Sequence, residues 1–208
     1  MTVRDNTEMF PNAATRLFSL QCAQLDHDEN FHKDVVILPL GERVKHMALH
    51  NAKYTGQLFD AVEKAYTARM ERILTDAFII SLATANTLNQ DLGLTLGDIG
   101  TVSKDLAEAG RRTAAGLNRD SSDNYWFIRE FARHNGSLSK ACESLDHLED
   151  VPFKSLMCAS NADLLKTILA EASAREFDLA MAHASRTREV EKRSIFSRRA
   201  NVEGAGRR

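Results

Sequence analysis

The chain contains few of the residues that break helices. Its 208 residues include only 3 prolines and 10 glycines, and aromatic side chains make up 7%. β-Sandwiches and barrels need frequent turns, which proline and glycine favour, so this scarcity argues against a turn-rich β fold. The length suits one ordinary domain or two small ones. We therefore expect an all-α protein.

The sequence also lacks a dominant charge, a cysteine framework and a long apolar run. Its 27 Lys and Arg residues nearly balance its 29 Asp and Glu residues, so no overall basic field indicates nucleic-acid binding. Cys22, Cys142 and Cys158 form no C-x-x-C motif and are expected to be buried free thiols. No run reaches the roughly 18 to 20 apolar residues of a membrane span, and the N-terminus lacks a signal-peptide pattern. We expect a cytoplasmic protein that does not bind membranes.

Helical periodicity is clear from residue 42 onward. Apolar side chains recur at steps of three and four residues, which indicates amphipathic helices. Helices are predicted over about 42–65, 71–89, 101–116, 124–148, 161–177 and 179–196. Before them, residues 18–25 suggest one more helix, and the apolar run 35–38 fits either a short strand or a strap across helices.

A few residues give local signals within this pattern. Gly56 lies in the middle of the first long helix, where glycine costs about 1 kcal/mol relative to alanine, and it indicates close helix packing or a break. Asp123 is expected to cap the helix that follows it. Ser160 and Asp163 have the spacing of a variant capping box, which would start a helix at about residue 161.

The most informative feature is an internal repeat at an offset of 80 residues. Six of twelve positions match between 52–63 and 132–143 when Lys is counted with Arg. Each half then carries two aspartates 15 residues apart: Asp76 and Asp91, then Asp163 and Asp178. Two similar helical hairpins cannot bury their apolar faces alone, whereas pairing them about a pseudo-twofold axis gives a four-helix core. Chance similarity between two alanine-rich helices is the alternative.

This arrangement resembles the all-α nucleoside triphosphate pyrophosphatase superfamily, the MazG-like and dimeric dUTPase-like proteins. Residues 75–92 are similar to the second motif helix of that superfamily, with Asp76 on its terminal aspartate, and Gly56-Gln57-Leu58 is similar to the first. The resemblance spans roughly 42–179. It implies a four-helix site where E-x-x-E and E-x-x-D motifs bind Mg²⁺ for the hydrolysis of a (deoxy)nucleoside triphosphate to monophosphate and pyrophosphate.

The acidic motifs are degenerate in both halves. The superfamily places its first acids just before and after the glycine, but this chain has other residues there: Lys53, Tyr54 and Gln57 in the first half, and Arg133, His134 and Ser137 in the second. Ile73 and Ser160 occupy the positions three residues before Asp76 and Asp163. The resemblance therefore supports a MazG-like fold better than it supports the hydrolytic reaction.

Four acids are the predicted Mg²⁺ ligands: Glu63, Asp76, Glu143 and Asp146. Glu63 and Glu143 match in the repeat, and Glu143 and Asp146 lie one turn apart on a helix face. Carboxylate oxygens are the ligands that Mg²⁺ prefers. Glu63 and Asp76 are the predicted catalytic residues. For all of these acids the alternative is a solvated helix face.

Basic residues and histidines suggest contacts with an anion. His50, Lys53 and Arg133 are the predicted substrate-binding residues, because Lys and Arg suit phosphate. His46 and His50 are four residues apart, which is a metal-ligand spacing, but no third ligand is evident and zinc is not expected. Arg186 and the basic residues that follow it are expected on a solvated helix end.

The expected organisation has five segments. They are an N-terminal extension (1–41), a first MazG-like half (42–100), a spacer helix and loop (101–123), a second MazG-like half (124–196) and a flexible tail (197–208). The leading hypothesis is a Mg²⁺-dependent nucleotide pyrophosphohydrolase. The alternative is a catalytically silent helical module that binds a nucleotide or a protein partner. Base and sugar preference and homodimer formation stay open.

Overall fold

The computed structural model describes residues 10–194, which form ten helices and no strand within that range. In chain order they are α1 (Ala13–Phe31), α2 (Lys33–Val36), α3 (Leu40–Glu63), α4 (Thr67–Leu88), α5 (Leu92–Thr95), α6 (Asp98–Val102), α7 (Leu106–Gly116), α8 (Trp126–Asp146), α9 (Phe153–Ala174) and α10 (Leu179–Arg193). The all-α prediction is confirmed. The predicted tail, 197–208, lies outside the described residues.

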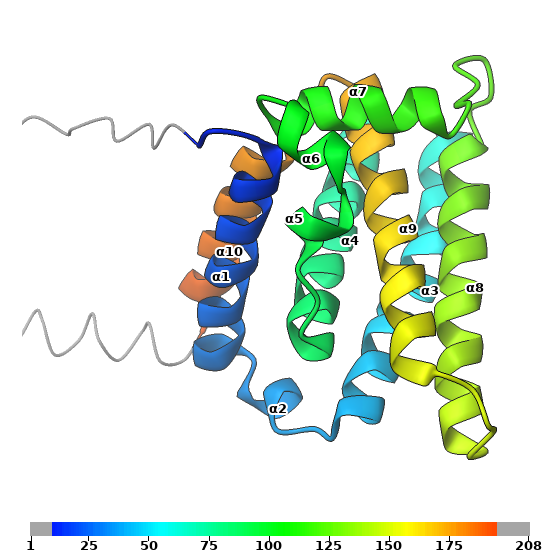
Figure 1. Cartoon of the computed structure of the whole chain (residues 1–208). Coiled ribbons are helices and arrows are strands. Elements are labelled where there is room, and N and C mark those ends of the chain that lie inside the picture. Colours follow the sequence, from blue (N-terminus) through cyan, green and yellow to red (C-terminus); the bar gives the residue numbers. More distant parts are fainter. Residues whose placement is uncertain (1–9, 195–208) are drawn as a thin grey trace, which may run out of the picture.

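Four long helices form a bundle at the centre of the molecule. α3 pairs with α4, α8 pairs with α9, and the two hairpins meet where α3 packs on α8 and α4 packs on α9 (Figure 1). Leu58 and Leu138, which match in the sequence repeat, are both completely buried. Burial of such side chains, worth about 1.5–3 kcal/mol each, favours this arrangement. The expected four-helix core is therefore present.

The two hairpins also share the conformation of their turns. Each first helix is followed by a residue with positive φ: Ala65 (φ 48°) after α3 and Leu148 (φ 53°) after α8. After each second helix, an aspartate accepts a hydrogen bond from a backbone amide of the next helix. Asp91 caps α5 in this way and Asp178 caps α10. The similarity of the halves thus includes their helix ends.

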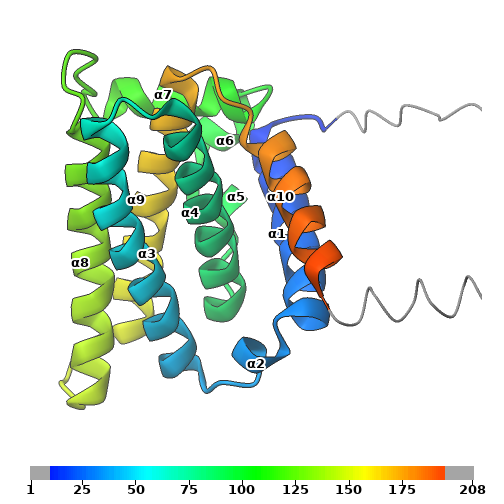
Figure 2. The same cartoon turned by 180° about the vertical axis from the view of Figure 1, so that it is seen from behind.

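Three further helices cover this bundle. α1 and α10 lie side by side against α4, and α7 packs on α9 (Figure 2). Ala13, Leu17 and Leu20 of α1 are buried, so the segment expected as an N-terminal extension contributes to the core. No helix in the described part of the chain is sufficiently long and apolar to cross a membrane.

Two predicted helix starts are wrong. α9 begins at Phe153, so Ser160 and Asp163 lie inside it and cap no helix. The helix starts early because Phe153 and Met157 extend its apolar face into the core. The helix expected over 101–116 is divided into α6 and α7, because Ser103 adopts an extended conformation.

Other local predictions also need correction. The run 35–38 is not a strand, since half of it belongs to the short helix α2. Gly56 causes neither a break nor close packing: α3 is continuous, and a Cβ at this position would meet no atom within 4 Å. Tyr125, not Asp123, is the N-cap of α8, although Asp123 accepts a hydrogen bond from the Tyr125 amide. Cys22 is exposed.

Candidate functional site

Asp76, the predicted central metal ligand, is ion-paired with two arginines. Its Oδ1 accepts a hydrogen bond from Nε of Arg186 on α10 at 2.7 Å. Nε of Arg72, one turn earlier on α4, lies 3.7 Å from Oδ2 of Asp76. Glu189 of α10 lies 3.1 Å from both Arg72 and Arg186. The charge of Asp76 is therefore compensated by arginines of the protein itself.

The other three predicted Mg²⁺ ligands lie at opposite ends of the bundle. Nζ of Lys45, near the start of α3, is 2.8 Å from Oδ2 of Asp146, so the start of α3 lies beside the end of α8. Glu143 is one turn before Asp146 on α8. Glu63 ends α3, and the 18 positions from Lys45 to Glu63 correspond to about 27 Å of helix. The four acids are not brought together around one ion.

His50 of α3 marks a polar region between α3 and α4. Its pKa is lowered to about 4, mainly by burial, which disfavours the charged imidazole, and also by nearby Lys53 and His46. Asp76 raises the same pKa, so His50 lies within electrostatic range of Asp76. Nζ of Lys53 is 3.3 Å from Nδ1 of His50. At neutral pH this imidazole is uncharged and accepts a hydrogen bond from the lysine.

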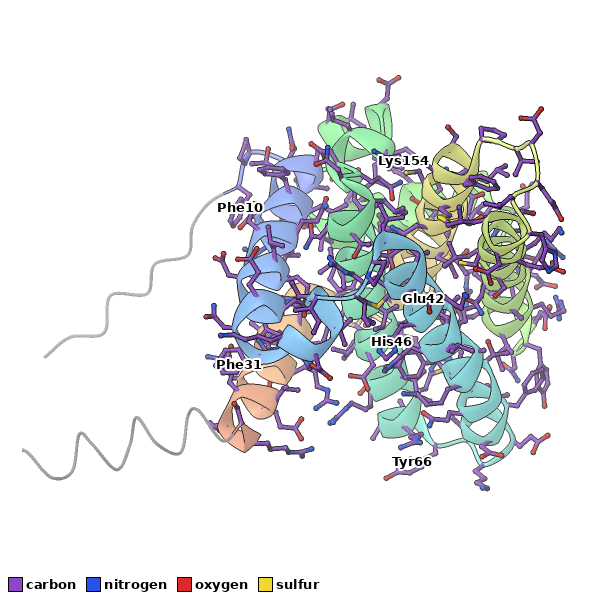
Figure 3. All side chains as sticks on the ribbon, turned by 90° about the horizontal axis from the view of Figure 1, so that it is seen from below. Phe10, Phe31, Glu42, His46, Tyr66 and Lys154 are labelled. Carbon is purple, nitrogen blue, oxygen red and sulfur yellow. The ribbon has the colours of Figure 1, made fainter. Side chains whose placement is uncertain are left out.

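A cavity of about 170 Å³ opens beside His50, between α1, α2, α3 and α4. Apolar residues of α4, including Ile79 and Ile80, line one side of it. Its polar lining consists of Asp28, Glu29, His32, Arg43, His46, His50, Asn86 and Thr87. Figure 3 shows His46 on the side of α3 that faces α2 and the end of α1. We call this cavity the α1–α4 cavity.

Arg43 holds one wall of the α1–α4 cavity in place. Its guanidinium donates hydrogen bonds to the backbone carbonyl oxygens of Val36 and Leu38, which join α2 to α3. Its Nε is buried and has no hydrogen-bond partner among the described residues. A buried donor without a partner costs about 1–3 kcal/mol.

Arg133 does not line the α1–α4 cavity. It lies on α8 with its side chain 65% exposed, and it is paired with Glu130 at 2.7 Å. The neighbouring His134 lies 3.8 Å from Glu130 and 3.9 Å from Asp163. Burial lowers the pKa of His134, and Nζ of Lys166 lies 3.3 Å from Oδ1 of Asp163. The second hairpin therefore has its own ion pairs at the positions that match Lys53 and Asp76.

Four residues of the site were not predicted from the sequence: Asp28, His32, Arg43 and Arg186. Asp28 and His32 come from the segment expected as an extension, and their spacing of four residues was the available signal. Arg186 was expected on a solvated helix end, but its side chain is only 18% exposed and lies against Asp76.

No known family model matches this chain, and neither a curated protein nor a solved structure matches it. The resemblance to the MazG-like proteins therefore depends on the motif residues alone.

Proposed function

We propose that this chain is a helical module that binds a phosphate-bearing ligand, such as a nucleotide, without hydrolysing it. The ion pair between Asp76 and Arg186, 2.7 Å long, carries the proposal. It neutralises the acid that a hydrolase of this kind would use for Mg²⁺. Hydrolysis of a phosphoanhydride needs a metal ion to offset developing charge and to orient water.

Two basic groups near the α1–α4 cavity suit an anion, while Asp28 and Glu29 add acidic groups to another part of its lining. Nε of Arg43 is a buried donor without a partner in the described residues, and Lys53 adds an ammonium group next to His50. Guanidinium and ammonium groups form charge-assisted hydrogen bonds with phosphate oxygens. These features support phosphate as the recognised group.

The size of the cavity limits how a nucleotide would bind. Its volume is about 170 Å³. Pockets that enclose a whole drug-sized ligand measure about 300 Å³ or more. A phosphate group would therefore occupy the cavity, whereas the base and sugar would lie outside it along α3.

Calorimetric titration of the full chain with ATP, dUTP and pyrophosphate, each with and without Mg²⁺, tests this proposal. We expect binding that does not require Mg²⁺ and no release of pyrophosphate. Lys53→Ala should weaken binding about tenfold or more, because it removes a charge-assisted contact. Arg133→Ala, at the matching position of the repeat, is the control and should bind like the wild type.

Two results would overturn the proposal. Mg²⁺-dependent pyrophosphate release that is lost in Asp76→Asn would establish the hydrolase instead. If the wild type binds none of the three ligands, the remaining alternative is a module that binds a protein partner.

A further inference from the structure

The end of α1 brings together three side chains that can bind a metal ion. One ligand atom from each of His27, Asp28 and His32 lies within 4.8 Å of the other two, and this is the one such group found among residues 10–194. The amide of His32 still donates to the carbonyl oxygen of Asp28 at 2.9 Å, as in a helix. Asp28 and His32 are therefore one turn apart on the same face.

We propose that His27, Asp28 and His32 form a binding site for a transition-metal ion, with zinc as the expected ion. Two imidazoles and one carboxylate are a ligand set that Zn²⁺ accepts, whereas Mg²⁺ prefers oxygen ligands alone. The ring centroids of His27 and His32 are 5.3 Å apart. Two imidazoles on one tetrahedral zinc ion, with Zn–N bonds of about 2 Å, have centroids about 5 Å apart.

Glu191 of α10 holds the imidazole of His27 in position. Nδ1 of His27, which is only 6% exposed, lies 3.2 Å from Oε1 of Glu191. A carboxylate that accepts from one imidazole nitrogen fixes the ring and leaves the other nitrogen for a metal ion. Glu191 is thus a positioning residue for this site.

Asp28 keeps one oxygen available for the ion. Nε2 of Gln24 donates to its Oδ1 at 2.8 Å, and Oδ2 is the second carboxylate oxygen. Burial raises the pKa of Asp28, and the hydrogen bond from Gln24 and the charges of His32, His27 and Arg43 offset only part of this rise. The positive charge of the Arg43 guanidinium repels a metal ion bound nearby. Two backbone carbonyl oxygens accept hydrogen bonds from this guanidinium, and Glu29 adds negative charge to the lining of the same cavity.

Two of the three proposed ligands lie at the α1–α4 cavity, whereas His27 lines a separate pocket between α1 and α10. Asp28 and His32 both line that cavity, so water or a ligand oxygen can complete a tetrahedron there. The inference does not depend on nucleotide binding, because its test uses the metal ion alone.

The experiment is a titration of the full, untagged chain after dialysis against EDTA. We expect ZnCl₂ to bind at one ion per chain by calorimetry, CoCl₂ to give the visible spectrum of tetrahedral Co²⁺, and MgCl₂ to give no binding heat. His32→Ala should lower the zinc affinity by more than about tenfold, and Glu191→Gln by about tenfold. Asp28→Asn, which can still accept from Gln24, should also lose affinity and provides a second test if His32→Ala does not fold.

His147→Ala is the matched control. His147 ends α8 as His32 ends α1, because each is the C-cap residue of its helix. This variant should bind zinc like the wild type. Absence of zinc binding by the wild type, unchanged affinity in Asp28→Asn and His32→Ala, or an equal loss in His147→Ala would each overturn the proposed site. None of these outcomes changes what is expected from the nucleotide titrations.

Discussion

The two hairpins have the same core but differ in how closely a neighbouring helix packs on them. In the second hairpin, α7 approaches α9 so closely that a Cβ on Gly110 would lie 2.3 Å from the carbonyl oxygen of Leu169. In the first hairpin, the start of α1 is close to α5, where a Cβ on Gly93 would lie 2.6 Å from the carbonyl oxygen of Ala14. The far end of α1 borders the α1–α4 cavity instead. Space for a ligand is not confined to the first hairpin, because a cavity of about 630 Å³ lies beside α7, the end of α9 and the start of α10.

The charged groups of the two hairpins show the same contrast. Glu171 of α9 is 3% exposed and is paired with Arg119 at 2.9 Å and Arg175 at 2.7 Å. Asp76 of α4 is 19% exposed and pairs with Arg186, whose side chain is 18% exposed. The carboxylate of the second hairpin is thus buried among its partners, whereas that of the first hairpin stays partly exposed.

Removing the buried charge of the second hairpin should have the largest effect. Glu171→Ala leaves Arg119 and Arg175 without their shared partner, and we expect a loss of about 3–5 kcal/mol in unfolding free energy. Denaturant unfolding measures it. The control is Asp163→Ala on the same helix, whose side chain is 45% exposed, with an expected change within about 0.5 kcal/mol. Equal losses in the two variants would contradict the structural role of Glu171.

The helix that covers the first hairpin should make stability depend on pH. Burial lowers the pKa of His183 on α10 from 6.5 to about 4, and its Nε2 lies 2.8 Å from Oε1 of Gln24. Because the unfolded chain takes up this proton at higher pH, the stabilisation is complete above about pH 6.5 and is lost as the pH falls towards 4. We expect a loss of about 2–3 kcal/mol over that window.

The pH effect can be isolated with His183→Gln, which does not titrate. Unfolding free energies of the wild type and the variant at pH 7, 6, 5 and 4 should converge as the pH falls. Parallel pH profiles for the two proteins would show that His183 is not the group responsible.

Close packing in the second hairpin predicts a smaller loss. Gly110→Ala places a methyl group against the backbone of α9, and overpacking of this kind costs about 1–3 kcal/mol. Thermal and denaturant unfolding both report it. A variant as stable as the wild type would mean that α7 can move away from α9, and the contrast between the hairpins would weaken.

Glycines in the paired helices should show no such contrast. Gly56 in α3 and Gly136 in α8 match in the repeat, and a Cβ at either position would meet no atom within 4 Å. Replacement by alanine should therefore stabilise each hairpin by up to about 1 kcal/mol, through helix propensity. Denaturant midpoints of the two single variants measure this gain. If one variant is stabilised and the other destabilised, the two hairpins are not equivalent at these positions.

The sequence was sufficient for the core because each long helix buries one apolar face. Leu58 and Leu138 lie on such faces, and their periodicity predicts both the helices and their pairing. The start of α9 was missed although Pro152 immediately precedes Phe153, and proline is common at helix starts. The capping pattern at Ser160 and Asp163 instead predicts a start at about residue 161.

The candidate site could not be predicted in the same way, because it is formed by contacts between distant segments. Asp76 and Arg186 are 110 residues apart, and nothing in the local pattern of either residue indicates the other. His32 and His46 line the same cavity because α2, four residues long, turns the chain back. So short a segment has no measurable periodicity.

The wall formed by α2 has a consequence for how a ligand enters. α2 contains no buried residue, and the guanidinium of Arg43 fastens it to α3 through the carbonyl oxygens of Val36 and Leu38. A segment with so little buried area opens at a small fraction of the global unfolding free energy. Amide hydrogens of α2 should therefore exchange with solvent long before those of α8 and α9. Local opening at this corner gives access to the cavity while the four-helix bundle stays folded.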